Sequence, residues 1–128
     1  MKMNKRTALE LNNNDREVLN KIANCDLKIR YNYIDYVEIL LGNKTFDTNI
    51  YHSIYSCYDK PSADKLFYYE QCLQFVQQLR YQDLNVIVSG IGTYNTFMFS
   101  YFISIEYNDS YYYIILTNKT TKVYIERI

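Results

Sequence analysis

The feature that most restricts how this chain can fold is its final stretch, residues 97–128, where apolar and polar residues alternate around two short turns. A period of two predicts strands with one buried face. Tight turns at Asn108-Asp109 and Asn118-Lys119 set the pairing, because opposed residues across a hairpin have a constant sum of residue numbers. The predicted pairs are Ile105 with Tyr112, Ile103 with Ile114 and Tyr101 with Leu116 across the first turn, and Leu116 with Thr121, Ile114 with Val123 and Tyr112 with Ile125 across the second. Both turns predict the same apolar face, and a slip by one residue would turn every core side chain away from it.

Two segments upstream have apolar residues at helical spacing. Asn14 and Glu17 match the pattern of a capping box, which predicts a helix over residues 15–24. Ser62 is placed to cap a longer helix over residues 62–81, which we expect to cover the apolar face of the three strands. The predicted stripe of this helix contains Leu66, Tyr69, Leu73, Val76 and Leu79, widened by Phe67, Cys72 and Phe75.

Further segments complete the predicted sheet. Alternation predicts strands over residues 27–33 and 84–89, and helical spacing predicts a short helix within residues 47–58. Residues 36–41 fit both a strand and a helix, and their β-branched and aromatic side chains favour the strand. Gly90-Ile91-Gly92 is expected to break the strand before it as a turn or bulge, because the signature of a phosphate-binding loop is incomplete there.

These elements predict an α+β fold in a single domain over residues 1–128, with residues 1–6 flexible. The prediction is an antiparallel sheet, with a C-terminal β-meander over about residues 84–128, packed against the long helix over about residues 62–81 and one or two shorter helices. A chain of 128 residues is long enough for one hydrophobic core.

Charge and residue inventory disfavour several classes of function. Lys and Arg balance Asp and Glu at 14 each, which is unlike a protein whose main role is to coat a phosphate backbone. With three cysteines in no CxxC spacing and one histidine, no metal or other cofactor is expected. No apolar run approaches the roughly 18 residues of a membrane helix. We therefore expect a cytoplasmic protein without membrane partners, in the host cytoplasm if it is viral.

His52 is the candidate catalytic residue. It could act as a general base if Asp47 or Asp59 oriented it, and Cys57 is the nearest thiol in the sequence. The acidic residues are scattered over different predicted elements, and no spacing gathers carboxylates for two-metal hydrolysis. The sequence therefore predicts a protein that is not an enzyme, with a small enzyme that uses His52 as general base as an alternative.

The predicted register also assembles a second face of the meander. Tyrosine is common at binding surfaces, because it combines a large contact area and few rotatable bonds with a hydroxyl group. Two interpretations stay open: the chain covers this face itself, for example with the helix predicted over residues 15–24, or the face docks on a partner or a second copy. The register places Tyr113 beside Ser104 and Tyr124, Tyr111 beside Glu106 and Glu126, and Ile115 beside Phe102 and Lys122. The predicted interface residues are Tyr111, Tyr113, Tyr124, Phe102, Ile115, Glu106 and Glu126.

The composition suggests an origin and a role. The chain has 16 Tyr but 3 Gly, 1 Pro and no Trp, which is typical of AT-rich codons and hence of a low-GC bacterium or a virus that infects one. Codon bias alone could also raise the tyrosine content. We expect a small non-catalytic protein that binds a host or viral protein, such as a phage or mobile-element accessory protein that inhibits a host factor like a defence nuclease. A homodimer is an allowed assembly.

A nucleic-acid-binding protein is the alternative from a different class. Residues 1–30 hold seven Lys and Arg against four Asp and Glu, and Lys21, Lys28 and Arg30 are the candidate contacts. The acidic neighbours of the tyrosines would repel phosphate, so nucleic acid is the less favoured partner.

Overall fold

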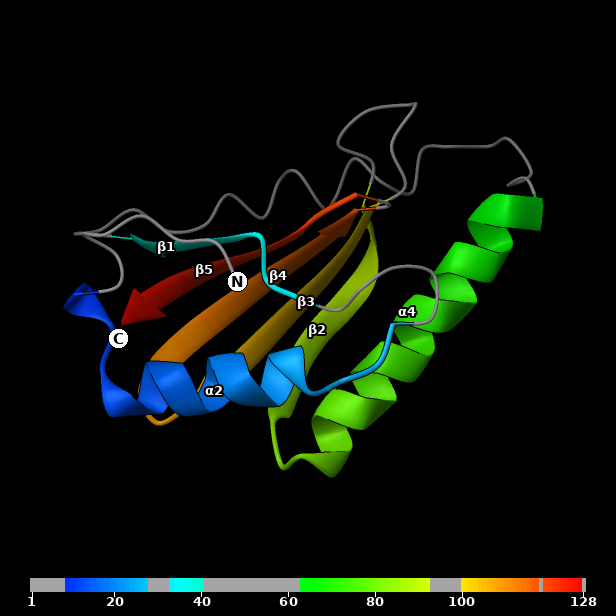
Figure 1. Cartoon of the computed structure of the whole chain (residues 1–128). Coiled ribbons are helices and arrows are strands. Elements are labelled where there is room, and N and C mark those ends of the chain that lie inside the picture. The colour runs from blue at the N-terminus through cyan, green and yellow to red at the C-terminus, as the bar shows by residue number, and fades with distance from the viewer. Residues whose placement is uncertain (1–8, 28–32, 41–62, 93–99, 118, 128) are drawn as a thin grey trace.

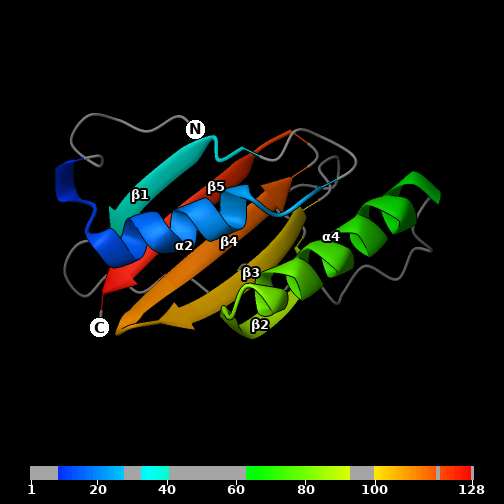
Figure 2. The ribbon, with the colours of Figure 1, turned by 60° about the horizontal axis from the view of Figure 1, so that its bottom comes forward.

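The computed structural model describes residues 9–27, 33–40, 63–92, 100–117 and 119–127. This part of the chain is an α+β fold, with a five-stranded mixed sheet and the helices α2 and α4 on one of its faces (Figure 1, Figure 2). The predicted fold class is confirmed. The elements in chain order are α2 (Asn13–Ala23), β1 (Tyr36–Leu40), α4 (Ala63–Tyr81), β2 (Asn85–Gly92), β3 (Ser100–Tyr107), β4 (Ser110–Thr117) and β5 (Thr121–Arg127).

The strands β2, β3, β4 and β5 form an antiparallel meander, and all six predicted residue pairs of its last three strands are confirmed. Asn108 and Asp109 have φ angles of 45° and 63°, as the type I′ turn of a two-residue hairpin requires. In the second turn, the Thr117 hydroxyl oxygen accepts hydrogen bonds from the backbone N–H groups of Lys119 and Thr120, at 3.2 and 2.9 Å. Turn chemistry and apolar alternation therefore select the same register.

The edge strand β1 makes the sheet mixed, because it pairs with β5 in parallel, whereas the sequence predicted an antiparallel sheet. The order of strands is β1-β5-β4-β3-β2. The strand predicted over residues 36–41 is confirmed over Tyr36–Leu40. Asp35 secures its start: its backbone N–H donates to the Thr121 carbonyl at 2.8 Å, and its carboxylate accepts from the Thr121 N–H at 2.6 Å.

The strand β2 continues through the glycines that were predicted to break it. Its residues Val86 and Val88 pair with consecutive residues of β3, which leaves Ile87 as the extra residue of a β-bulge. The prediction that Gly90-Ile91-Gly92 ends the strand is wrong, because the bulge holds the irregularity and regular pairing resumes as far as Gly92.

The helix α2 begins two residues earlier than predicted. The Asn12 side chain accepts from the Asp15 backbone N–H at 2.8 Å, and the Asp15 carboxylate accepts from the Asn12 N–H at 3.1 Å. These two residues form the capping box, so the box predicted from Asn14 and Glu17 is wrong. Asparagine occupies positions 12, 13 and 14, and each could cap a helix. Asn12 is the residue that caps α2 because its partner in the capping box is Asp15, whose side chain is fully buried in the fold.

The helix α4 confirms the long helix predicted over residues 62–81, except that Ser62 lies outside the described residues. Its buried face is rotated from the predicted stripe: Leu66, Phe67 and Leu73 are 45%, 50% and 55% exposed. Apolar residues occur around most of the helix, so spacing alone could not identify the side that packs. The buried residues of α4 are Tyr68, Tyr69, Gln71, Cys72, Phe75, Val76 and Leu79.

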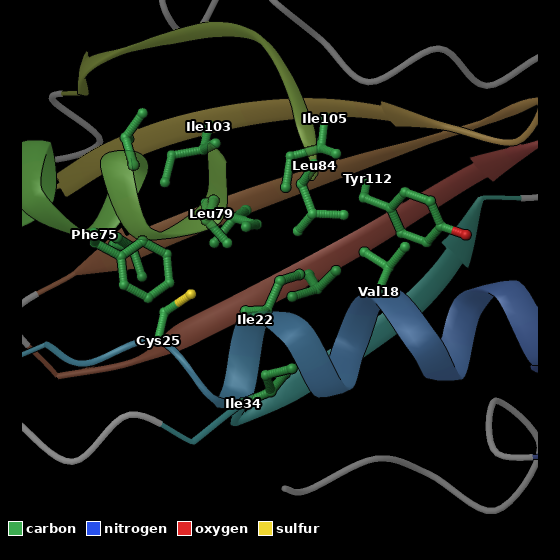
Figure 3. Close-up of a cluster of buried hydrophobic side chains, with 14 of the residues drawn as sticks. Val18, Ile22, Cys25, Ile34, Phe75, Leu79, Leu84, Ile103, Ile105 and Tyr112 are labelled. Carbon is green, nitrogen blue, oxygen red and sulfur yellow. The ribbon is translucent and has the colours of Figure 1, made fainter. Parts of the chain in front are cut away.

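The core lies between the two helices and the apolar face of the meander. Figure 3 shows Val18 and Ile22 of α2 and Leu79 of α4 directed toward Ile105 and Tyr112 of the sheet, and all five are buried. The helix α4 lies beside β2 and β3, and α2 packs on the same face (Figure 2). The interpretation that the helix predicted over residues 15–24, which is α2, covers the tyrosine-bearing side of the meander is therefore wrong.

Some predicted elements lie outside the described residues. They are the short helix within residues 47–58, the flexible terminus at residues 1–6, and the middle of the strand predicted over residues 27–33. The ends of that segment, Leu27 and Tyr33, are described and belong to no strand.

Replacing Asp83 with glycine is expected to raise the free energy of unfolding by about 1 kcal/mol. Asp83 follows α4 with a φ of 63°, a left-handed conformation that glycine adopts without steric cost. The backbone N–H of Leu84 donates to the Leu79 carbonyl at 3.2 Å, and that of Asp83 to the Arg80 carbonyl at 3.0 Å, in a Schellman motif that needs this conformation.

Urea unfolding measures this change. Glu70→Gly, at an exposed position inside α4, is the control and should lower the stability by about 1 kcal/mol. An Asp83→Gly protein no more stable than the parent would show that the helix end carries no strain at this residue.

Candidate functional site

The candidate site is the face of the sheet opposite to α2 and α4. Successive side chains of a strand point to opposite faces, so the residues between those of the core come together here. The sequence placed nine of them on this face, the seven predicted interface residues together with Ser104 and Lys122. It could not place β1, which contributes Tyr36 opposite Lys122 and Glu38 opposite Tyr124. We call this surface the tyrosine face; it consists of Tyr36, Glu38, Phe102, Glu106, Tyr111, Tyr113, Ile115, Lys122, Tyr124 and Glu126.

The predicted neighbours on this face are those of the structure. Tyr111 lies opposite Glu106 of β3 and Glu126 of β5, and Tyr113 lies between Ser104 and Tyr124 in the same way. Phe102 and Lys122 flank Ile115. The register of β3, β4 and β5 is the same for both faces of the sheet. The pairing that brings the core residues together on one face therefore also brings the tyrosines together on the other.

The aromatic rings of the tyrosine face are in contact with one another. The ring centroids of Tyr111 and Tyr113 are 6.2 Å apart, and those of Tyr113 and Phe102 are 6.3 Å apart with planes inclined by 13°. Tyr36 and Tyr124 form a separate pair with centroids 5.9 Å apart. These separations lie in the range at which aromatic rings attract one another. The face is therefore an ordered array of rings across four strands.

The burial of these residues follows a gradient. Phe102 and Ile115 are 4% and 7% exposed, whereas the side chains of Tyr111, Tyr113 and Tyr124 remain partly exposed. Glu106, at the end of β3, is exposed. The part of this face that solvent reaches therefore includes the three tyrosine rings and Glu106, whereas Phe102 and Ile115 are already buried within the chain.

The phenol groups of Tyr36 and Tyr113 stay protonated at neutral pH. Burial, followed by the nearby Glu126 carboxylate, raises the pKa of Tyr113 to about 12. Burial and then Glu38 raise the pKa of Tyr36 above its ordinary value. Both hydroxyl groups are therefore neutral hydrogen-bond donors that can pair with carboxylates of this face or with acceptors of a partner.

A second polar cluster lies on the core side, at the start of α2. The Asp15 carboxylate accepts hydrogen bonds from the Tyr112 hydroxyl at 2.7 Å and from the Arg127 guanidinium at 2.6 Å. Arg127 also donates to the Glu10 carbonyl at 3.1 Å. Burial and then Asp15 raise the pKa of Tyr112 well above its usual range. Asp15 and Tyr112 are both fully buried, and the hydrogen bonds of Asp15 to Tyr112 and Arg127 join α2 to β4 and β5.

The candidate nucleic-acid contacts are only partly described. Lys21 forms an ion pair with Glu17 at 3.7 Å, and its ammonium lies 5.3 Å from the ring centroid of Tyr107. These contacts hold Lys21 against its own fold. Lys28 and Arg30 lie outside the described residues.

The proposed catalytic histidine, His52, and the nearby Cys57 also lie outside the described residues. The described thiols, Cys25 and Cys72, are buried, and burial raises their pKa values to about 11 and about 12. They are therefore protonated at neutral pH and are not thiolate nucleophiles.

Within the described ranges, no three His, Cys, Asp or Glu side chains gather in a way that could hold a metal ion. None of the described helices has the length and apolar character needed to cross a membrane.

The sequence missed an apolar patch on the outer side of α4. Leu66, Phe67, Leu73 and Tyr81 are 45%, 50%, 55% and 85% exposed, and we call them the helix patch. Leu66 and Leu73 belong to the stripe that was predicted to be buried, and Phe67 lies beside that stripe. Only the packing of α4 could therefore show that these side chains are exposed. These exposed apolar side chains form a second surface at which a partner could bind, so binding at the helix patch can be compared with binding at the tyrosine face.

No protein-family model matches this chain, and comparisons with curated proteins and with solved structures found no match.

Proposed function

We propose that this protein is a non-catalytic binding protein whose tyrosine face docks on another protein. The observation that carries the proposal is the row of contacting rings from Tyr111 through Tyr113 to Phe102, in which both tyrosines are partly exposed and lie near the exposed Glu106. Tyrosines held in place by neighbouring rings lose little conformational entropy when a partner binds. Residues of this kind supply much of the binding energy at protein interfaces.

The kind of partner is proposed from the composition. The codon bias and the small size of the chain fit a phage or mobile-element accessory protein that binds a host factor and inhibits it, for example a defence nuclease. A second copy of the chain is the other protein that the tyrosine face could meet. Light scattering of the purified protein distinguishes this outcome, because a homodimer has twice the mass of 15.4 kDa.

Tyr111→Ala is expected to weaken the complex by about tenfold or more, because a partly exposed tyrosine ring that a partner buries as a hot spot contributes more than about 1 kcal/mol. The partner is first captured from the lysate of a low-GC host and then purified. Isothermal titration calorimetry compares the dissociation constants of the parent and the variant.

Leu73→Ala is the matched control, because it removes a half-exposed apolar side chain from the helix patch. It should change the affinity by less than about twofold. If Leu73→Ala abolishes binding while Tyr111→Ala leaves it unchanged, the partner docks on α4 and the proposed surface is wrong.

A further inference from the structure

The tyrosine face has an acidic end, and Tyr111 is at its centre. Tyr111 on β4 lies directly opposite Glu106 on β3 and Glu126 on β5. Neighbouring strands are about 4.8 Å apart, so the two glutamates begin roughly 10 Å apart with the ring between them. A negative π-face with a carboxylate position on either side is a favourable environment for a cation.

The charges of the described residues also favour a cation at this face. The tyrosine face holds three carboxylates, from Glu38, Glu106 and Glu126, and one ammonium, from Lys122, which leaves a net charge of −2. Lys122 is four residues from Glu126 along β5, or about 13 Å.

The other basic residue of β5, Arg127, is turned to the core side. Its guanidinium contacts the Asp15 carboxylate at 2.6 Å. Among the described residues, the charged side chains directly opposite Tyr111 are therefore both acidic, Glu106 on β3 and Glu126 on β5.

We infer that the tyrosine face binds a basic protein segment, with an arginine or lysine side chain of the partner over the Tyr111 ring and beside Glu106. This inference rests on the proposed function, because it names the chemistry of the partner for the same surface. Arginine is the better fit, since its planar guanidinium can stack on the ring while it donates to a carboxylate. A nucleic acid is not expected to bind here, because its phosphates would be repelled by the net negative charge of this face.

The test uses the full chain, labelled with ¹⁵N, and three synthetic decapeptides as probes: alternating Gly and Arg, Gly and Gln, and Gly and Glu. We expect the arginine peptide to shift the backbone amide signals of Tyr111 and Glu106, and the other two peptides to leave them unchanged. The affinity of the arginine peptide should fall at least about tenfold between 50 and 500 mM salt, because exposed charges are screened.

Glu106→Lys should weaken the arginine peptide by about tenfold or more, since a carboxylate beside the ring becomes a cation. Glu70→Lys makes the same charge change at an exposed position of α4 and is the control, with an expected change of less than about twofold. Circular dichroism verifies that both variants fold. Equal losses for the two variants, shifts confined to other residues, or equal binding of the arginine and glutamine peptides would overturn the inference.

Failure of this inference can be separated from failure of the proposed function. A natural partner whose binding requires Tyr111 but tolerates both Glu106→Lys and high salt would uphold the docking surface and reject the basic segment. A partner or oligonucleotide that binds with no effect of Tyr111→Ala would reject the docking surface itself.

Discussion

Replacing Asp15 with alanine should lower the free energy of unfolding by about 3 kcal/mol. The Asp15 side chain is fully buried and accepts hydrogen bonds from the Tyr112 hydroxyl, the Arg127 guanidinium and the Asn12 backbone. Its removal leaves the Tyr112 hydroxyl without its acceptor in the core and removes one of the two hydrogen bonds of the capping box of α2, the one from the Asn12 N–H. The expected loss lies at the low end for a broken ion pair, because the Arg127 side chain is 35% exposed and can turn to water.

Urea unfolding followed by circular dichroism measures this loss. Tyr112→Phe removes a single hydrogen bond of the cluster and should cost about 1 kcal/mol. Glu17→Ala, which breaks a partly exposed ion pair with Lys21 and a surface hydrogen bond with Tyr107, should change the stability by less than about 1 kcal/mol. If Asp15→Ala cost no more than Glu17→Ala, the cluster would not hold α2 on the sheet.

The second large effect is a loss of stability in alkaline solution. Burial raises the pKa of Cys72 from 9.0 to about 12 and that of Cys25 from 9.0 to about 11, so above pH 9 the unfolded chain releases protons that the folded chain keeps. Stability is therefore fully present below pH 9 and falls as the pH rises toward the folded values. At about 1.4 kcal/mol for each pH unit and thiol, the two thiols together should remove roughly 4 kcal/mol between pH 9 and pH 11.

Urea unfolding in the presence of a reductant, at pH 7.5, 9, 10 and 11, tests this dependence. Cys72→Ala should be less stable than the parent at pH 7.5, because it leaves a small cavity, but between pH 9 and pH 11 it should lose roughly 2 kcal/mol less than the parent. An equal loss in parent and variant would assign the alkaline instability to other groups, with the buried Tyr112 first among them, since its pKa is also raised.

The meander was predictable in detail because its information is local. Each hairpin pairs residues that are close in sequence, and the turn residues Asn108 and Asp109 adopt the positive φ angles that a two-residue loop needs. The alternation of apolar residues then allows one register only. For the same reason, the sequence is sufficient to predict the neighbours of Tyr111 and Tyr113 on the second face.

The helices show where local information ends. The spacing of apolar residues in α4 is compatible with burial of either of two sides of the helix. Leu73, which was predicted to be in the core, is 55% exposed. Only the position of α4 beside β2 and β3 selected the side centred on Cys72 and Phe75. The start of α2 was also open among three asparagines, and a contact with Tyr112 and Arg127, about a hundred residues away, settled it.

The sequence by itself determined the α+β class, the extent of the long helix and the residue-by-residue pairing of the last three strands, because turns and alternating side chains act between near neighbours. Tertiary structure alone decided which side of α4 is buried, that β1 runs parallel to β5, and that Asp15 joins α2 to the sheet. These choices depend on contacts between residues far apart in the chain, which no local pattern encodes. The aromatic array of the tyrosine face needed both kinds of information: local register placed its tyrosines, and long-range pairing with β1 completed it.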